Sequence, residues 1–184
     1  MTNATANPGQ LSQQETARLL RLATYASTSV AIFLIAAKLV AWAASDSVSL
    51  LATLIDSMLD ALASLINLVA VRHALTPADK EHRFGHGKAE ALAGLSQSLF
   101  IAGSAAYLLL EAGRRIINPV AVESIGLGIW VMVISIVATL LLLSFQQHVI
   151  RKTNSTAIRA DALHYRTDLL VNGSVIVALV LASF

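Results

Sequence analysis

The chain has 184 residues, of which 56% are hydrophobic and 13% are charged, and its mean hydropathy is +0.69. Soluble domains carry about 25% charged residues, so this composition argues against an ordinary soluble domain and predicts a protein of the lipid bilayer. The absence of cysteine excludes disulfides and thiolate metal sites, and basic loops beside a membrane explain the net charge of +2 better than nucleic-acid binding does.

The N-terminal stretch is polar and precedes the first apolar segment. It lacks the basic flank and apolar centre of a cleaved signal peptide, so residues 1–17 are expected to form a mobile tail and residues 18–184 the transmembrane domain. The apolar residues then collect into segments of about 20, the length at which a helix crosses a bilayer. They do not alternate with polar residues as in barrel strands. The predicted fold is therefore an all-α polytopic transmembrane helical bundle, with spans at about residues 22–44, 48–71, 91–110, 125–145 and 158–184.

Basic residues predict the orientation of this bundle. Cytoplasmic loops of membrane proteins are rich in lysine and arginine, and the loop between the second and third spans carries four such residues. They are Arg72, Lys80, Arg83 and Lys88. The N-terminus is then cytoplasmic, and five spans leave residue 184 at the outer face, so a further C-terminal part of the chain is expected beyond it. Lys38, near the outer end of the first span, is expected to extend toward the interface.

Two acidic residues, Asp56 and Asp60, lie near the middle of the second span. An ionised carboxylate at the centre of a membrane helix costs roughly 2.5 to 3.5 kcal/mol. Their i, i+4 spacing puts both on one helix face, where the two charges repel unless a proton or a cation lies between them. A bound cation is the simplest explanation for the pair.

The fifth span repeats this spacing with His164 and Asp168. Counting about 1.5 Å per residue places Asp60 and Asp168 at the same height, roughly 15 to 17 Å above the inner surface. Three carboxylates and one imidazole suit a tetrahedral Zn²⁺ site, while Fe²⁺, Mn²⁺, Co²⁺ and Cd²⁺ remain possible ions. In the competing interpretation these groups only make hydrogen bonds between helices. Two pairs of ionisable residues at the same height in the membrane favour the metal site, because ionisable residues inside membranes are usually functional.

Other polar residues near the ends of the spans are expected to have structural roles. Asp161 lies close to the start of the fifth span and beside Arg159, so it is expected to cap the helix or form a salt bridge. It is left out of the predicted metal site. His73 and His148 stand alone at the ends of spans and are expected to be interfacial or structural.

The loop after the second span contains Asp79, His82 and His86, with Gly85 and Gly87 beside the last histidine. The two glycines allow a tight turn, and one carboxylate with two imidazoles could ligate a second ion. Charged loops that contain histidines are usually only solvated. On spacing alone, the solvated loop is therefore the favoured interpretation.

Three stretches, SLLATLIDSMLD, HRFGHGKAEALA and RADALHYRTDLLVN, resemble the cation diffusion facilitator family, especially the bacterial zinc and iron efflux proteins. The resemblance implies a homodimeric, proton-coupled antiporter in the bacterial inner membrane that exports Zn²⁺, with its transport site at Asp56, Asp60, His164 and Asp168. It also implies a second, cytoplasmic metal site at the three loop residues Asp79, His82 and His86. Family members resemble six-helix proteins followed by a cytoplasmic metal-binding domain, so the sixth helix and that domain are expected to lie outside residues 1–184.

Two other functions remain as alternatives. A passive cation channel could also use a ring of carboxylates, although conduction requires weak binding, whereas four ligands that strip the ion of water suit alternating access. A metal-dependent hydrolase inside the membrane is the less favoured alternative, because four protein ligands leave no open position for a catalytic water. The sequence therefore predicts a secondary active transporter, not an enzyme.

Overall fold

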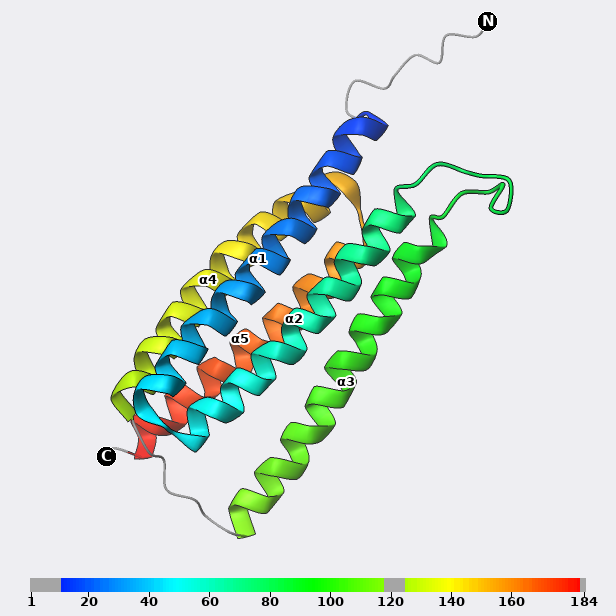
Figure 1. Ribbon diagram of the computed structural model, residues 1–184. Helices are drawn as coiled ribbons and strands as arrows, with labels where there is room; N and C mark the ends of the chain where they lie inside the picture. Colours follow the sequence, from blue (N-terminus) through cyan, green and yellow to red (C-terminus); the bar gives the residue numbers. More distant parts are fainter. Residues whose placement is uncertain (1–10, 118–124, 183–184) are drawn as a thin grey trace, which may run out of the picture.

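The computed structural model describes residues 11–117 and 125–182, and helices account for most of this part of the chain. The helices are α1 (Gln13–Ser45), α2 (Val48–Ala74), α3 (Lys88–Ile117), α4 (Ile125–Thr153) and α5 (Thr156–Ala182). They lie alongside one another in a single bundle (Figure 1). Among the described residues there is no strand, so the predicted all-α fold is confirmed.

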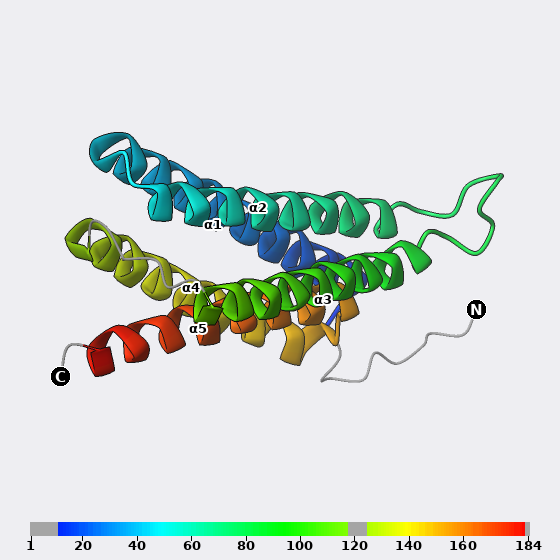
Figure 2. The same ribbon diagram turned by 90° about the horizontal axis from the view of Figure 1, so that it is seen from below.

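The five helices contact one another in a closed ring. Helix α1 contacts α2 and α4, α5 contacts α3 and α4, and α2 contacts α3. Seen from below, α1 and α2 lie on one side of the bundle and α3, α4 and α5 on the other (Figure 2). Helices α2 and α5 also touch across this division. The two spans predicted to carry the metal ligands are therefore neighbours in space.

By length and composition, α1, α2, α3 and α4 each contain a segment apolar enough to cross a membrane. Helix α5 is as long as α2, at 27 residues, but its first half contains the charged sequence RADALHYRTD. Helices α1 to α4 extend past the apolar segments predicted from the sequence, because hydrogen bonding continues into polar turns where the hydrophobic signal stops. Helix α5 begins two residues before its predicted span, of which residues 183–184 lie outside the described residues. The described part of the chain is thus a helical membrane bundle.

Helix α1 begins earlier than predicted. It begins at Gln13, so residues 13–17, expected to belong to the tail, form its first turn. Ser12 and Glu15 form a capping box, in which the Glu15 N–H donates to Ser12 Oγ at 3.2 Å and the Ser12 N–H donates to Glu15 Oε2 at 2.9 Å. This arrangement satisfies two amide groups that would otherwise lack partners. The rest of the predicted tail, residues 1–10, lies outside the described residues.

Glu90, in the first turn of α3, ties that helix to the start of α5. Its Oε1 accepts hydrogen bonds from Ser155 Oγ at 2.5 Å and from the Ala157 N–H at 3.3 Å. Ser155 Oγ in turn accepts the Ile158 N–H at 3.2 Å. Unpaired N–H groups at a helix start favour a negative charge, so Glu90 stabilises the start of α5 against α3.

A buried polar cluster occupies the interior of the bundle and draws on every helix. Its members each expose 2% or less of their surface; they are Ser27 (α1), Ser64 (α2), Gln97 (α3), Gln146 (α4), and Asp161 and Tyr165 (α5). Ser27 Oγ donates to Ser64 Oγ at 3.1 Å, and Ser64 Oγ lies 2.9 Å from Tyr165 Oη. We refer to these six residues as the interior cluster.

Asp161 is the acceptor at the centre of the interior cluster. Gln97 Nε2 donates to its Oδ1 at 3.1 Å, and Gln146 Nε2 donates to its Oδ2 at 2.7 Å. The prediction of a helix cap or a salt bridge for Asp161 is wrong, because the residue lies more than one turn inside α5 and is fully buried, whereas Arg159 is exposed. The two carboxylate oxygens instead join α3 and α4 to α5.

Candidate functional site

Asp60, His164 and Asp168 come together between α2 and α5. His164 Nε2 lies 3.1 Å from Asp60 Oδ1 and 3.7 Å from Asp168 Oδ2. One ligand atom from each residue lies within 4.8 Å of the others, a spacing from which three side chains can close on one ion. The His164 side chain is 3% exposed, while those of Asp60 and Asp168 are 20% and 30% exposed. An ion could therefore reach the carboxylates before the imidazole.

The positions of these residues on their helices produce this arrangement. His164 and Asp168 are four residues apart on α5, so they lie on one face of that helix. The contact between His164 and Asp60 places the α5 pair level with the middle of α2. Helix geometry predicted this common height, and the structure bears it out. Asp168 Oδ2 is also buried without a hydrogen-bond partner among the described residues, so it is available to a ligand.

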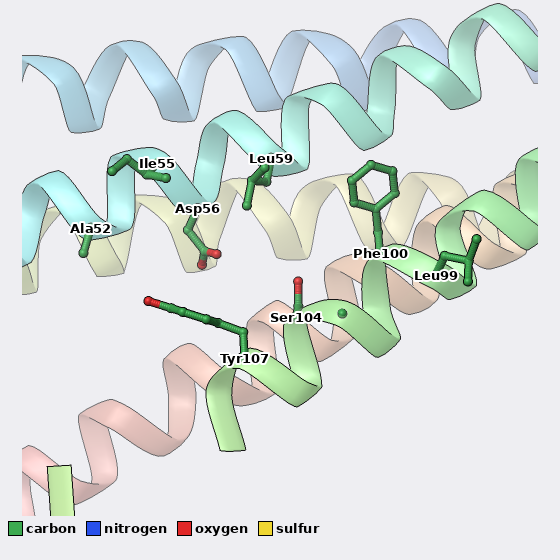
Figure 3. A pocket seen from close by; sticks show the side chains of 9 residues that line it. Ala52, Ile55, Asp56, Leu59, Leu99, Phe100, Ser104 and Tyr107 are labelled. Carbon is green, nitrogen blue, oxygen red and sulfur yellow. The ribbon is translucent and has the colours of Figure 1, made fainter. Parts of the chain in front are cut away.

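Asp56, the fourth predicted ligand, is not a member of this three-residue group. It lies one turn before Asp60 on α2, is exposed, and points its carboxylate into the space between α2 and α3 (Figure 3). Ser104 and Tyr107 of α3 project into the same space. Asp56 nevertheless lines a cavity of about 60 Å³ together with Asp60 and Asp168. The three carboxylates thus share one polar cavity, with Asp56 at a distance from the other two.

A larger, mostly apolar cavity adjoins Asp56 from the side of α3. Its volume is about 630 Å³, and it is lined by Ala52, Ile55, Asp56, Leu59, Leu99, Phe100, Gly103, Ser104 and Tyr107 (Figure 3). Asp56 is the one acidic residue in this lining. The carboxylate therefore lies where the polar cavity meets an apolar cavity between α2 and α3.

Lys38 is a residue near the site that sequence reasoning placed elsewhere. Its Nζ donates to the backbone oxygen of Thr53 at 3.2 Å and to Ser57 Oγ at 2.6 Å, and the side chain lines the same small cavity as Asp56 and Asp60. The prediction that Lys38 extends toward the interface is wrong. A positive charge in a membrane helix is attracted by nearby carboxylates, and here it turns toward α2. The ammonium offsets part of their negative charge.

The loop residues Asp79, His82 and His86 form a second group, with one ligand atom of each within 4.8 Å of the others. His82 Nδ1 lies 3.2 Å from Asp79 Oδ1, and His86 Nε2 lies 3.6 Å from Asp79 Oδ2. Gly85 has a φ of +77° and its N–H donates to the His82 oxygen at 2.9 Å, which turns the chain so that His86 returns toward Asp79. A solvated loop would not require the three side chains to converge.

Hydrogen bonds prepare Asp79 to act as an anion. The His82 N–H donates to Asp79 Oδ1 at 2.5 Å, and this bond, aided by the His82 ring and by the Glu81 N–H at 3.0 Å, lowers the pKa of the Asp79 carboxyl. Asp79 therefore stays ionised at neutral pH, and the stabilisation that its charge provides is lost only as the pH falls through this lowered pKa.

If the loop binds Zn²⁺, its affinity is expected to fall as the pH is lowered, because imidazole ligands must be neutral to bind a metal ion. Titration of Zn²⁺ into Asp60→Asn protein at several pH values would measure this. An affinity that does not change with pH would exclude the histidines as ligands.

Comparison with known proteins gives a consistent result. Residues 24–184 match the cation efflux transmembrane domain family. The cation-efflux pump FieF of Pectobacterium carotovorum is 52% identical over 166 residues, and that of Yersinia enterocolitica is 51% identical over 166 residues. FieF of Shewanella oneidensis is 51% identical over 165 residues. These matches cover 90% of this chain, which spans about half of the relatives' length, 55% to 56%.

Proposed function

The chain belongs to the cation diffusion facilitator family of membrane transporters, and from this premise we propose that it carries out the efflux of a divalent metal ion in exchange for protons. The observation that supports this most directly is the convergence of Asp60, His164 and Asp168 between two membrane helices. Asp56, in the same cavity, is the fourth ligand. The ion is the transported substrate and is released at the end of each cycle.

The ligand chemistry supports Zn²⁺ as the substrate. The set contains oxygen and nitrogen atoms only, and three carboxylates with one imidazole can complete the tetrahedral shell that zinc prefers. Fe²⁺, Cd²⁺, Mn²⁺ and Co²⁺ fit the same ligand types and form the rest of the candidate list. For Asp56 to join the other three, its carboxylate must turn from the space beside α3 toward Asp60, which lies one helical turn away.

The contacts of His164 support the proposal of proton exchange. Its imidazole lies between two carboxylates, and a protonated imidazole provides a positive charge that holds both of them. A metal ion that binds to these groups takes over this role and releases the proton, and a returning proton reverses the exchange. A proton gradient directed into the cell can therefore drive the metal ion outward when the bundle opens the site alternately to the two sides of the membrane.

A passive channel is the second candidate function, supported by the partial exposure of Asp60 and Asp168. A channel and an antiporter differ in proton coupling. The full-length protein in proteoliposomes should show saturable Zn²⁺ flux, with protons moving in the opposite direction at a fixed membrane potential. Flux that neither saturates nor moves protons would exclude antiport and support the channel. We further propose that the protein acts as a homodimer in the bacterial inner membrane, as the family resemblance implies.

The substitution His164→Ala tests the proton carrier. It is expected to reduce Zn²⁺-dependent proton flux by at least about tenfold, because the site loses both a metal ligand and its titrating imidazole. The measurement is proton flux with a pH-sensitive dye inside proteoliposomes. His148→Ala, which removes an exposed histidine near the end of α4, should leave the flux unchanged. Full coupled transport by His164→Ala would contradict the assignment.

A further inference from the structure

A third imidazole lies beside the loop group of Asp79, His82 and His86. His73, in the last turn of α2, has its ring centroid 4.4 Å from that of His86, with the rings inclined at 67°. On its other side, the His86 ring lies 4.5 Å from the ring of His82. His86 is therefore the middle member of three adjacent imidazoles. From the sequence, His73 was expected to stand alone, because it lies nine positions before His82.

The middle histidine is held in place but has unused bonding capacity. Its side chain is 7% exposed, and its Nε2 is directed at Asp79, at 3.6 Å. Its Nδ1 is buried and has no hydrogen-bond partner among the described residues. Buried polar atoms are nearly always hydrogen-bonded, so an orphaned nitrogen in a group of three imidazoles and a carboxylate indicates a ligand that the side chains alone do not provide.

The backbone at the end of α2 supports the same conclusion. The Thr76 N–H and Thr76 Oγ1 both donate to the His73 oxygen, at 3.0 and 2.6 Å. These bonds end the helix and start the connection to α3, which extends past the helix ends and returns (Figures 1 and 2). The C-terminus of a helix carries partial negative charge and favours a cation. His73 and His82 are both exposed, so burial of apolar surface does not explain why the rings gather there.

We propose that His73 is the fourth ligand of the loop metal site, which then consists of three imidazoles and the Asp79 carboxylate. This inference rests on the loop metal site at Asp79, His82 and His86 that the family resemblance implies. Three histidines and one carboxylate form a nitrogen-rich set that suits Zn²⁺. The exposed rings of His73 and His82 can rotate about their side-chain bonds, whereas the buried His86 ring sets the centre of the site.

Inclusion of His73 gives the loop site the four protein ligands that are usual for structural zinc sites. The ion then joins the last turn of α2, which carries His73, to the loop before α3, which carries Asp79, His82 and His86. The loop ion would secure this connection between the two helices.

Cobalt can test this inference, because Co²⁺ occupies zinc sites and its visible absorption is strong in tetrahedral sites and weak in five- or six-coordinate ones. The full chain with Asp60→Asn, which disables the intramembrane site, is titrated with Co²⁺ in detergent. The parent should show the strong tetrahedral band. His73→Asn should lose most of that band and bind Co²⁺ at least about tenfold more weakly, because one ligand is replaced by water. The control His148→Asn should match the parent.

Two further variants separate this inference from the site itself. Asp79→Asn and His86→Asn should each abolish the band, and if neither does, the proposal of a loop metal site fails. If both abolish it while His73→Asn keeps the band and the affinity of the parent, the loop site stands and His73 is not its ligand. The helical circular dichroism of each variant should equal that of the parent, since Asp79 and His86 lie in the loop and His73 lies in the last turn of α2.

Discussion

The substitution Asp60→Asn is expected to abolish Zn²⁺-driven proton flux. Asparagine keeps the shape of the side chain but removes the negative charge that lies 3.1 Å from His164 Nε2. Loss of this ligand is expected to weaken metal binding by about 100-fold or more, because loss of even the groups that surround metal ligands costs about 10- to 100-fold. The remaining ligands would then release the ion before the bundle changes its orientation.

The measurement is Zn²⁺-dependent acidification or alkalinisation of proteoliposomes that contain the full-length protein at a fixed membrane potential. Asp46→Asn is the matched control, because Asp46 is an exposed carboxylate in the turn between α1 and α2 with a φ of 50°, a conformation that asparagine also adopts. This control should transport like the wild type. Equal transport by Asp60→Asn would mean that the carboxylates have a structural role, and the proposed site would be wrong.

The substitution Asp161→Ala is expected to cause the largest loss of stability. It removes an acceptor from two buried amide groups: Gln146 Nε2, and Gln97 Nε2, which keeps its bond to the Ala63 oxygen at 3.3 Å. Each unsatisfied group costs about 1 to 3 kcal/mol, so the free energy of unfolding should fall by about 3 kcal/mol. Asp161→Asn should cost less, because its remaining carbonyl oxygen can still accept one of the two hydrogen bonds.

Equilibrium unfolding in mixed micelles would measure this loss. Arg159→Ala is the control: it lies two residues earlier on α5 and is exposed, and its unfolding free energy should stay within about 0.5 kcal/mol of the wild type. If Arg159→Ala were as destabilising as Asp161→Ala, an ion pair between the two residues would be the better explanation of the Asp161 effect. If neither substitution changed the stability, the interior cluster would contribute little to holding the helices together.

The interior cluster and the three-residue metal group share helix α5. Asp161 and Tyr165 face the other helices in the cluster, and His164 and Asp168 face Asp60. One helix therefore carries both the contacts that hold the bundle and the groups proposed to bind the ion. The two sets of substitutions separate these roles, since Asp161→Ala is predicted to act on unfolding and Asp60→Asn on transport.

Several features were accessible from the sequence because they depend on local order along the chain. Apolar segments of membrane-spanning length predicted the all-α bundle, and the i, i+4 spacing put His164 and Asp168 on one face. Nearly equal counts from the helix ends predicted that Asp60 and Asp168 would lie at the same height. The capping box of Ser12 and Glu15 also has the sequence pattern S-x-x-E, although the apolar pattern predicted a later start for the first helix.

The tertiary structure alone decided the features that depend on how helices rotate against one another and on the path of the loop. It separated Asp56 from the three-residue group, turned Lys38 inward and buried Asp161 between two glutamines. It also brought His73 beside His86. Spacing along one helix determines which residues share a face, but the neighbours of that face depend on packing between helices. For this reason the sequence predicted the ligand pairs, and only the structure identified their surroundings.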